Sequence, residues 1–256
     1  MTSAAPSTRR VQARLDGAIG RITLADPDHR NALSRELSDD LAAAVHSLLA
    51  DDARVLVLDA EPPVFCAGGS LDGLIERTHP LAASYAGFTA LADAPVPTIA
   101  AVCGPAIGAG VNLPLACDVV LAGESARFDP RFLDVGIHPG GGHLWRLAER
   151  VGEQGAAALV LCGDSLTGAE AAAKGLAWRC VPDDDLPALA TAFAERVAGR
   201  SPELVRLAKA TLRASRALSD PADAAAVELA AQEWSVAQPY FRETVTRLRD
   251  RVRSRR

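Results

Sequence analysis

The hydrophobic positions in the first half of the chain predict short strands that alternate with helices. Three short runs are apolar almost throughout, as is typical of buried strands, and they occupy residues 55–58, 98–102 and 119–122. Before the first run, apolar residues recur every three or four positions from Leu37 to Leu48, which predicts a helix that begins after Ser34. Because strand, loop and helix follow one another, we expect an α/β fold with its site where strands end in loops.

The second half of the chain, from His143 onward, carries almost only helix signals. The sequence TGAE at residues 167–170 is a capping box. A capping residue followed by proline marks two further helix starts, at residues 201–202 and 220–221. We therefore expect a core of residues 1–200 and a helical C-terminal region of residues 201–256.

Composition narrows the class of protein. A net charge of −5 argues against a nucleic-acid-binding protein, because neutralising phosphates takes an excess of lysine and arginine. The five cysteines form no C-x-x-C pair, which fits a reduced cytoplasmic protein. Residues 1–10 hold no secretory signal, and no run reaches the roughly 20 apolar residues of a membrane helix. No metal-ligand spacing links the histidines, and Trp145 and Trp178 are expected in the core.

Two loops that follow buried strands are the candidates for chemistry. They are FCAGG at residues 65–69 and GPAIGAG at residues 104–110. Small residues let a backbone approach a ligand closely, and each loop leads into a helix start with free N–H groups. Two such loops can aim two donors at one oxygen. By themselves such glycines more often mark plain turns, but nucleotide-binding motifs and a G-x-S-x-G elbow are absent.

Other short motifs accompany the two loops in a fixed order. They include NAL at residues 31–33, PTIAAV at 97–102, ACD at 116–118, GIHPG at 136–140 and LTGAEA at 166–171. Together they resemble the crotonase (enoyl-CoA hydratase/isomerase) superfamily, from about residue 17 to residue 209. The resemblance implies a crotonase-like spiral of ββα units with a helical C-terminal region that makes homotrimers or dimers of trimers. It also implies an acyl-CoA substrate, whose coenzyme A is the only cofactor-like group.

The resemblance further implies roles for particular residues. The N–H groups of Gly69 and Ala109 would form an oxyanion hole for the thioester carbonyl. Backbone around Ala67 and Leu71 would hold the adenine of coenzyme A. Arg30 stands where relatives place a base near the CoA phosphates, although an exposed loop arginine is an equal alternative.

The two positions that carry glutamate in hydratases of this superfamily hold Asn112 and Phe132 here. Asparagine can orient a water but cannot take its proton, and phenylalanine can only shape a pocket. Asp129 would lie on the face of Phe132 if this segment is helical, unless it merely caps that helix. His138 could act as acid or base, or could only line the acyl pocket together with Pro139.

Three functions therefore remain open. The first is a lyase or isomerase that forms a thioester enolate, which the resemblance would name an enoyl-CoA hydratase although hydration should be weak. The second is an enoyl-CoA isomerase, which needs a single acid/base group. The third is a non-catalytic protein that binds acyl-CoA.

Overall fold

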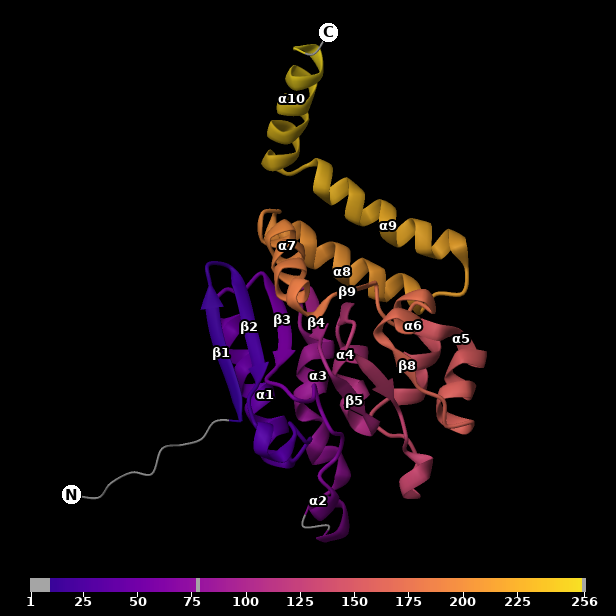
Figure 1. Ribbon diagram of the computed structural model, residues 1–256. Coiled ribbons are helices and arrows are strands. Elements are labelled where there is room, and N and C mark those ends of the chain that lie inside the picture. Colours follow the sequence, from indigo (N-terminus) through magenta and orange to yellow (C-terminus); the bar gives the residue numbers. More distant parts are fainter. Residues whose placement is uncertain (1–9, 77–78, 255–256) are drawn as a thin grey trace, which may run out of the picture. The chain divides into compact units, whose positions relative to one another are not determined.

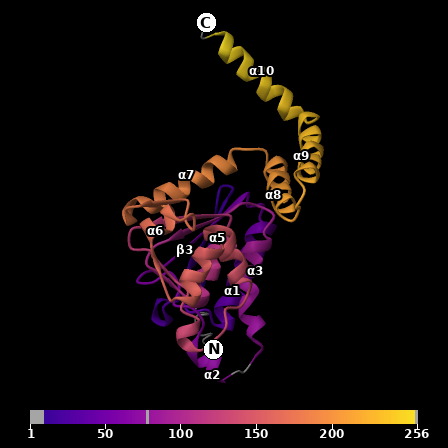
Figure 2. The same cartoon turned by 90° about the vertical axis from the view of Figure 1, so that its right-hand side faces the viewer.

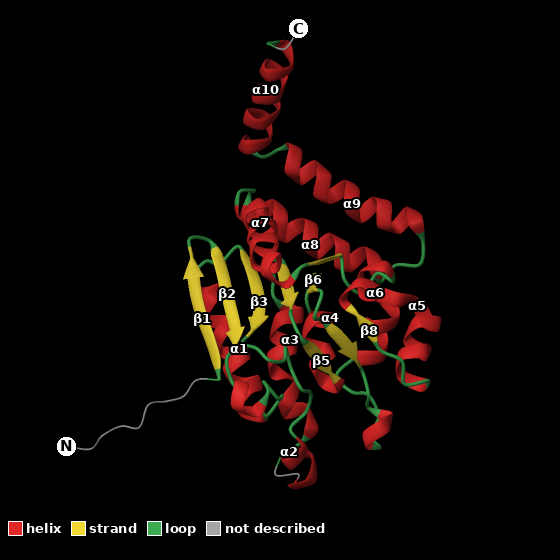
Figure 3. Cartoon of the chain, viewed as in Figure 1, coloured by secondary structure: helices red, strands yellow, loops and turns green. Residues whose placement is uncertain are grey.

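The structure, a computed structural model, describes residues 10–76 and 79–254. Residues 1–9, where no secretory signal is expected, lie outside the described residues. The chain forms two compact units that divide between Arg196 and Val197. The first unit is α/β and the second is helical (Figures 1 and 3). The predicted α/β fold with a helical C-terminal region is thus confirmed.

Mixed β-sheet is the frame of the first unit. The described residues form a six-stranded sheet in the order β1-β2-β3-β4-β6-β9, in which β1 and β2 are antiparallel and the later neighbours are parallel. A three-stranded sheet has the order β5-β7-β8. The strands are β1 (Val11–Asp16), β2 (Ile19–Leu24), β3 (Val55–Ala60), β4 (Thr98–Val102), β5 (Pro105–Ile107), β6 (Val119–Gly123), β7 (Arg127–Asp129), β8 (Leu166–Thr167) and β9 (Arg179–Val181).

Helices follow the strands and then make up the whole second unit. They are α1 (Arg35–Ala50), α2 (Leu71–Glu76), α3 (Ala86–Asp93), α4 (Asn112–Ala116), α5 (His143–Leu161), α6 (Gly168–Ala173), α7 (Leu186–Ala198), α8 (Pro202–Arg216), α9 (Pro221–Val236) and α10 (Pro239–Arg253). Within residues 10–76 and 79–254, no helix combines the length and apolar character needed to cross a membrane.

Local signals in the sequence account for most of these elements. The side chain of Ser34 accepts a hydrogen bond from the N–H of Leu37 at 3.1 Å and so caps α1. Thr167 and Glu170 form the predicted capping box at the start of α6. The helices α8 and α9 also begin at the predicted proline positions.

The expectation that Trp145 and Trp178 lie in the core is wrong. The segment after His143 is almost entirely helical, as predicted, and departs from this only at the short strands β8 and β9, which pair with β7 and β6. These strands are held by partners distant in the sequence, and they have too few residues to show a hydrophobic period. Trp145 and Trp178 lie on the surface of the chain, with 61% and 67% of their area exposed.

A buried serine joins α1 to the start of α3, and these two helices lie side by side (Figures 1 and 2). The hydroxyl of Ser38 is fully buried. It donates to the carbonyl of Ser84 at 2.9 Å and accepts from the N–H of Gly87 at 2.9 Å. Because Ser84 also lines the main cavity of this unit, this contact fixes one part of the cavity wall to the core.

Replacing Ser38 by alanine should destabilise the protein by about 1–3 kcal/mol, because the buried N–H of Gly87 and the partly buried carbonyl of Ser84 lose their partner. The free energy of unfolding in urea measures this. The control is Ser47→Ala, on the exposed face of the same helix, which should stay within about 0.5 kcal/mol of the wild type. Equal effects of the two changes would contradict a structural role for the buried hydroxyl.

Candidate active site

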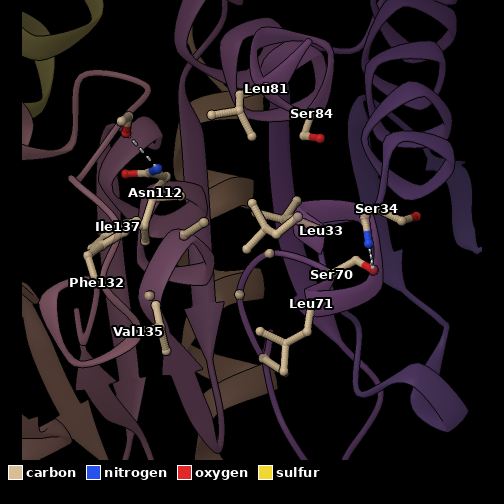
Figure 4. A pocket seen from close by; sticks show the side chains of 18 of the residues that line it. Leu33, Ser34, Ser70, Leu71, Leu81, Ser84, Asn112, Phe132, Val135 and Ile137 are labelled. Atoms are coloured by element: carbon tan, nitrogen blue, oxygen red, sulfur yellow. Dashed lines mark hydrogen bonds between the residues drawn. The ribbon is translucent and has the colours of Figure 1, made fainter. Parts of the chain in front are cut away.

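The main cavity of the first unit has a volume of about 480 Å³, a size that suits a small-molecule ligand. Figure 4 shows Asn112, Phe132 and Ile137 on one wall. The opposite wall carries residues such as Leu33 of the NAL segment, Ser70 of the loop before α2 and Leu71 at the start of α2. Gly69 and Ala109 line the same cavity, so the two predicted loops do meet at one place.

The loop after β3 and the turn after β4 are joined by their backbones. Cys66 and Ala106 form a parallel bridge. In it the N–H of Ile107 donates to the carbonyl of Cys66 at 2.9 Å, and the N–H of Cys66 donates to the carbonyl of Pro105 at 3.1 Å. The cysteine side chain is buried, and burial raises the pKa of its thiol to about 12, so Cys66 serves packing and not nucleophilic chemistry.

The close approach of these loops requires glycine. A Cβ on Gly68, whose φ is +94°, would lie 2.7 Å from the carbonyl oxygen of Ile107 and 3.5 Å from the nitrogen of Ala109. A Cβ on Gly110 would lie 2.5 Å from the carbonyl oxygen of Cys66. Any side chain at these positions would therefore separate the two backbones.

Two backbone amides next to this junction have no backbone acceptor among residues 10–76 and 79–254. Leu33 and Gly69 form a parallel bridge, in which the N–H of Leu33 donates to the carbonyl of Gly68 and the N–H of Ser70 donates to the carbonyl of Leu33. In such a bridge the N–H of the central residue, Gly69, points away from the partner strand. The N–H of Ala109 stands at the open start of the helical turn Gly108–Val111. Within the described chain, no backbone partner accepts from either N–H.

Asn112 opens α4 and is only 1% exposed. Its amide nitrogen donates to the carbonyl of Gly140 at 3.2 Å, and its amide oxygen lies 2.8 Å from Nδ1 of His143. The ring of Phe132 meets the His143 ring edge-on, with 4.8 Å between centroids. The two positions that the sequence resemblance assigns to the glutamates of hydratases thus hold a fixed amide and a packed aromatic ring.

Of the two residues considered as acid/base groups, His138 lines the cavity and Asp129 does not. His138 lines the cavity, and its Nδ1 lies 2.7 Å from the carbonyl of Pro139. Because a carbonyl can only accept, Nδ1 carries the proton and Nε2 is left for chemistry. Pro139 itself is buried behind this wall, and Gly140 lines the cavity in its place.

Asp129 does not lie on the face of Phe132, because the segment is a strand and not a helix: Asp129 ends β7. It is 6% exposed and is not among the residues that line the cavity. Its carboxylate pairs with Arg131 and lies 3.6 Å from Nε of Arg127. The carboxylate is held by two arginines and does not line the cavity, so the geometry does not favour Asp129 for proton transfer.

The residues expected to hold coenzyme A lie in or beside the segment that leads into α2. Ala67 and Leu71 line the cavity. The N–H of Ala67 donates to the carbonyl of Arg30 at 3.0 Å, which places Arg30 beside that loop. The side chain of Arg30 is exposed and does not line the cavity.

The sequence analysis missed several residues of the site. Glu36, His79 and Arg131 line the cavity. His143 forms a hydrogen bond with the amide oxygen of Asn112. A hydrogen bond with its own backbone N–H lowers the pKa of Glu36, and a hydrogen bond with the Ser34 side chain acts in the same direction. The sequence signal for Glu36 was its place in the first turn of α1, two residues after the capping Ser34. The contact between Asn112 and His143 spans 31 positions and has no local signal.

Comparisons with known proteins agree with this arrangement. The family model described as enoyl-CoA hydratase/isomerase matches residues 14–251. EchA14 of Mycobacterium tuberculosis, a probable enoyl-CoA hydratase, is 40% identical over 238 residues, which cover 89% of this chain and 92% of that protein.

Solved structures share the fold over nearly the whole chain. Human enoyl coenzyme A hydratase domain-containing protein 3 superposes with a TM-score of 0.88 at 27% identity, covering 95% of this chain and 98% of that one. A Thermobifida fusca protein solved in complex with CoA has a TM-score of 0.80 at 30% identity, covering 90% and 93%. The chain therefore belongs to the enoyl-CoA hydratase/isomerase family, the crotonase superfamily that its motifs resemble.

Proposed function

We propose that the protein is a lyase or isomerase that binds an acyl-CoA or enoyl-CoA thioester and stabilises its enolate with the N–H groups of Gly69 and Ala109. The observation that carries this proposal is the pairing of two loops that leaves both amides free beside one cavity. Loss of a proton next to the thioester carbonyl puts negative charge on the carbonyl oxygen. A preorganised donor at such an oxygen contributes roughly 3–4 kcal/mol to the stability of the transition state.

The coenzyme A part of the substrate fits the end of the site near Ala67. The Thermobifida fusca relative was solved with CoA, which supports CoA as the carrier here. We assign the adenine to the backbone around Ala67 and Leu71 and the phosphates to the exposed side chain of Arg30. A homotrimer or dimer of trimers stays a prediction.

Hydration of an enoyl thioester is the reaction that the site supports least. It needs one group to activate water and another to protonate carbon. Asn112 can hold a water but cannot take its proton, and Phe132 offers neither function. The carboxylate of Glu36 lines the cavity, but its lowered pKa makes it a weaker base.

Isomerisation of a 3-enoyl thioester is a second candidate, favoured by the position of His138. In this reaction the substrate loses a proton from C2 and regains one at C4, while the double bond moves to C2–C3. One base can carry that proton. Nε2 of His138 is available for it, because the carbonyl of Pro139 holds the proton on Nδ1.

We expect Gly68→Ala to lower affinity for butyryl-CoA at least about tenfold, because the new Cβ would push the two backbones apart and misalign the donors. Titration calorimetry measures this. Gly163→Ala is the matched control, since Gly163 has a φ of +71° and open space around it but does not line the cavity. If Gly68→Ala binds as tightly as the wild type, the proposed donor pair is wrong.

Crotonyl-CoA hydration by the wild type should be slower than in efficient enzymes by roughly 10²–10⁴-fold for each missing acid/base group. The rate follows from the loss of absorbance of the conjugated double bond. Turnover at about 10 s⁻¹ or more, the range of ordinary enzymes, would show that another group in the cavity replaces the glutamates.

Isomerisation of a 3-enoyl-CoA should fall roughly 100-fold or more in His138→Gln, because glutamine cannot carry the proton. The exposed His46 on α1 provides the control His46→Gln, which should retain full activity. A loss in Asp129→Asn instead would return the role of base to Asp129. Binding of acyl-CoA without turnover of any enoyl-CoA would favour the non-catalytic alternative.

A further inference from the structure

The strand β1 leaves one edge of the six-stranded sheet open. It stands at the end of the strand order and, within the described residues, pairs only with β2. Figure 3 shows it at the outer edge of the sheet. Residues 12–16 of this strand are all exposed. An exposed strand edge is a template on which another strand can add by main-chain hydrogen bonds.

The hydrogen bonds of the neighbouring strands decide which groups of β1 face this edge. The N–H of Glu61 donates to the carbonyl of Leu24 at 2.8 Å, so Leu24 faces β3, and the next residue, Ala25, donates to the carbonyl of Arg10 at 2.8 Å. Backbone groups alternate in direction along a strand. The even-numbered residues of β1 therefore bond to β2, and the free edge carries the N–H and C=O groups of Val11, Ala13 and Leu15.

A second copy of β1 can satisfy all of these groups at once. If two β1 strands lie antiparallel about a two-fold axis at Ala13, this alanine pairs with its own counterpart and Val11 pairs with Leu15. Each such pair exchanges two main-chain hydrogen bonds, so about six form in total. The contact uses the same residues on both copies, which is the property of an isologous interface.

The charges on β1 favour this register over its neighbours. It places Arg10 opposite Asp16 of the other copy, and the two-fold axis repeats this pair. Moving the axis to Gln12 would set Arg10 against Arg14, and moving it to Arg14 would set two copies of that arginine against each other. Like charges directly opposite destabilise a strand pair, whereas opposite charges stabilise it. The Asp16 side chain is 64% exposed, so it can face a second copy.

The apolar face of the strand agrees with the same register. Leu15 is a large hydrophobic residue with 40% of its area exposed, and Val11 is buried. The axis at Ala13 sets Leu15 of one copy opposite Val11 of the other, which covers the exposed leucine. Backbone, charge and apolar side chains are thus all matched by β1 itself, and this self-complementarity identifies the partner as a second copy of this chain.

We propose that β1 is a dimerisation edge, through which two copies join their six-stranded sheets into one continuous sheet. No residue of β1 lines the cavity, so this inference does not depend on the proposed thioester site. It also involves no residue of the C-terminal region that is expected to make trimers. The quantity to measure is therefore a halving of the assembly's mass, whatever other contacts contribute to it.

Ala13→Pro tests the pairing. It removes one outward N–H but no hydrogen bond to β2, and proline is tolerated on an edge strand with its nitrogen toward solvent. Sedimentation velocity should give an assembly with half the wild-type mass at the same protein concentration. Ala13→Ser, which keeps the N–H, should retain the wild-type mass, and both variants should bind butyryl-CoA as the wild type does. Equal masses for Ala13→Pro and the wild type at every concentration would refute the dimerisation edge.

Cysteine cross-linking tests the register, and it also serves if Ala13→Pro does not fold. The parent protein carries Cys103→Ser and Cys162→Ser, which remove the two exposed cysteines among the described residues. In the proposed pair the two copies of position 13 have Cα atoms about 5.5 Å apart, within the range of about 4.4–6.8 Å that a disulfide spans. Mild oxidation of Ala13→Cys in this parent should therefore give a covalent dimer.

The matched control is Leu15→Cys in the same parent. Its two copies would lie four residues apart along the paired strands, or roughly 13 Å, so it should stay monomeric on a denaturing gel, as should the parent. Cross-linking of Leu15→Cys as efficient as that of Ala13→Cys would refute the register. A folded Ala13→Cys, verified by circular dichroism, that forms no covalent dimer would refute the pairing itself.

Discussion

The backbone pairing between Cys66 and Ala106 is the constraint on which the site depends. It joins the loop after β3 to the turn after β4 through main-chain hydrogen bonds, and Gly68 and Gly110 permit the close approach. The spacing of the two proposed donors is then a property of the backbone. Side chains around the cavity can change during evolution without moving those donors, which suits a fold that hosts different reactions.

Much of the fold could be predicted because its signals are local. The cap at Ser34 and the capping box at Thr167 are set by residues three positions apart, and the buried strands are short apolar runs. The strands β5 and β7 could not be predicted, since three residues carry no period. They exist because Ala106 and Phe128 pair across a sheet, and that pairing depends on the whole fold.

The same distinction separates the predicted parts of the site from the missed ones. Gly69 and Ala109 belong to loops with recognisable patterns, and the structure brings both loops to one cavity. The position of Asp129 was inferred from helical spacing, which fails because the segment is a strand that ends in an ion pair with Arg131. The contact between Asn112 and His143 joins α4 to α5, and neither segment alone contains a sign of it.

The ion pair between Asp129 and Arg131 also affects the charge on the cavity wall. Arg131 lines the wall, and a hydrogen bond with Asp129 raises the pKa of its guanidinium, so the arginine stays charged while its field is largely cancelled. A carboxylate on a ligand would have to compete with a partner that is already in place. The charge on this part of the cavity wall is therefore balanced within the protein itself, by the ion pair between Arg131 and Asp129.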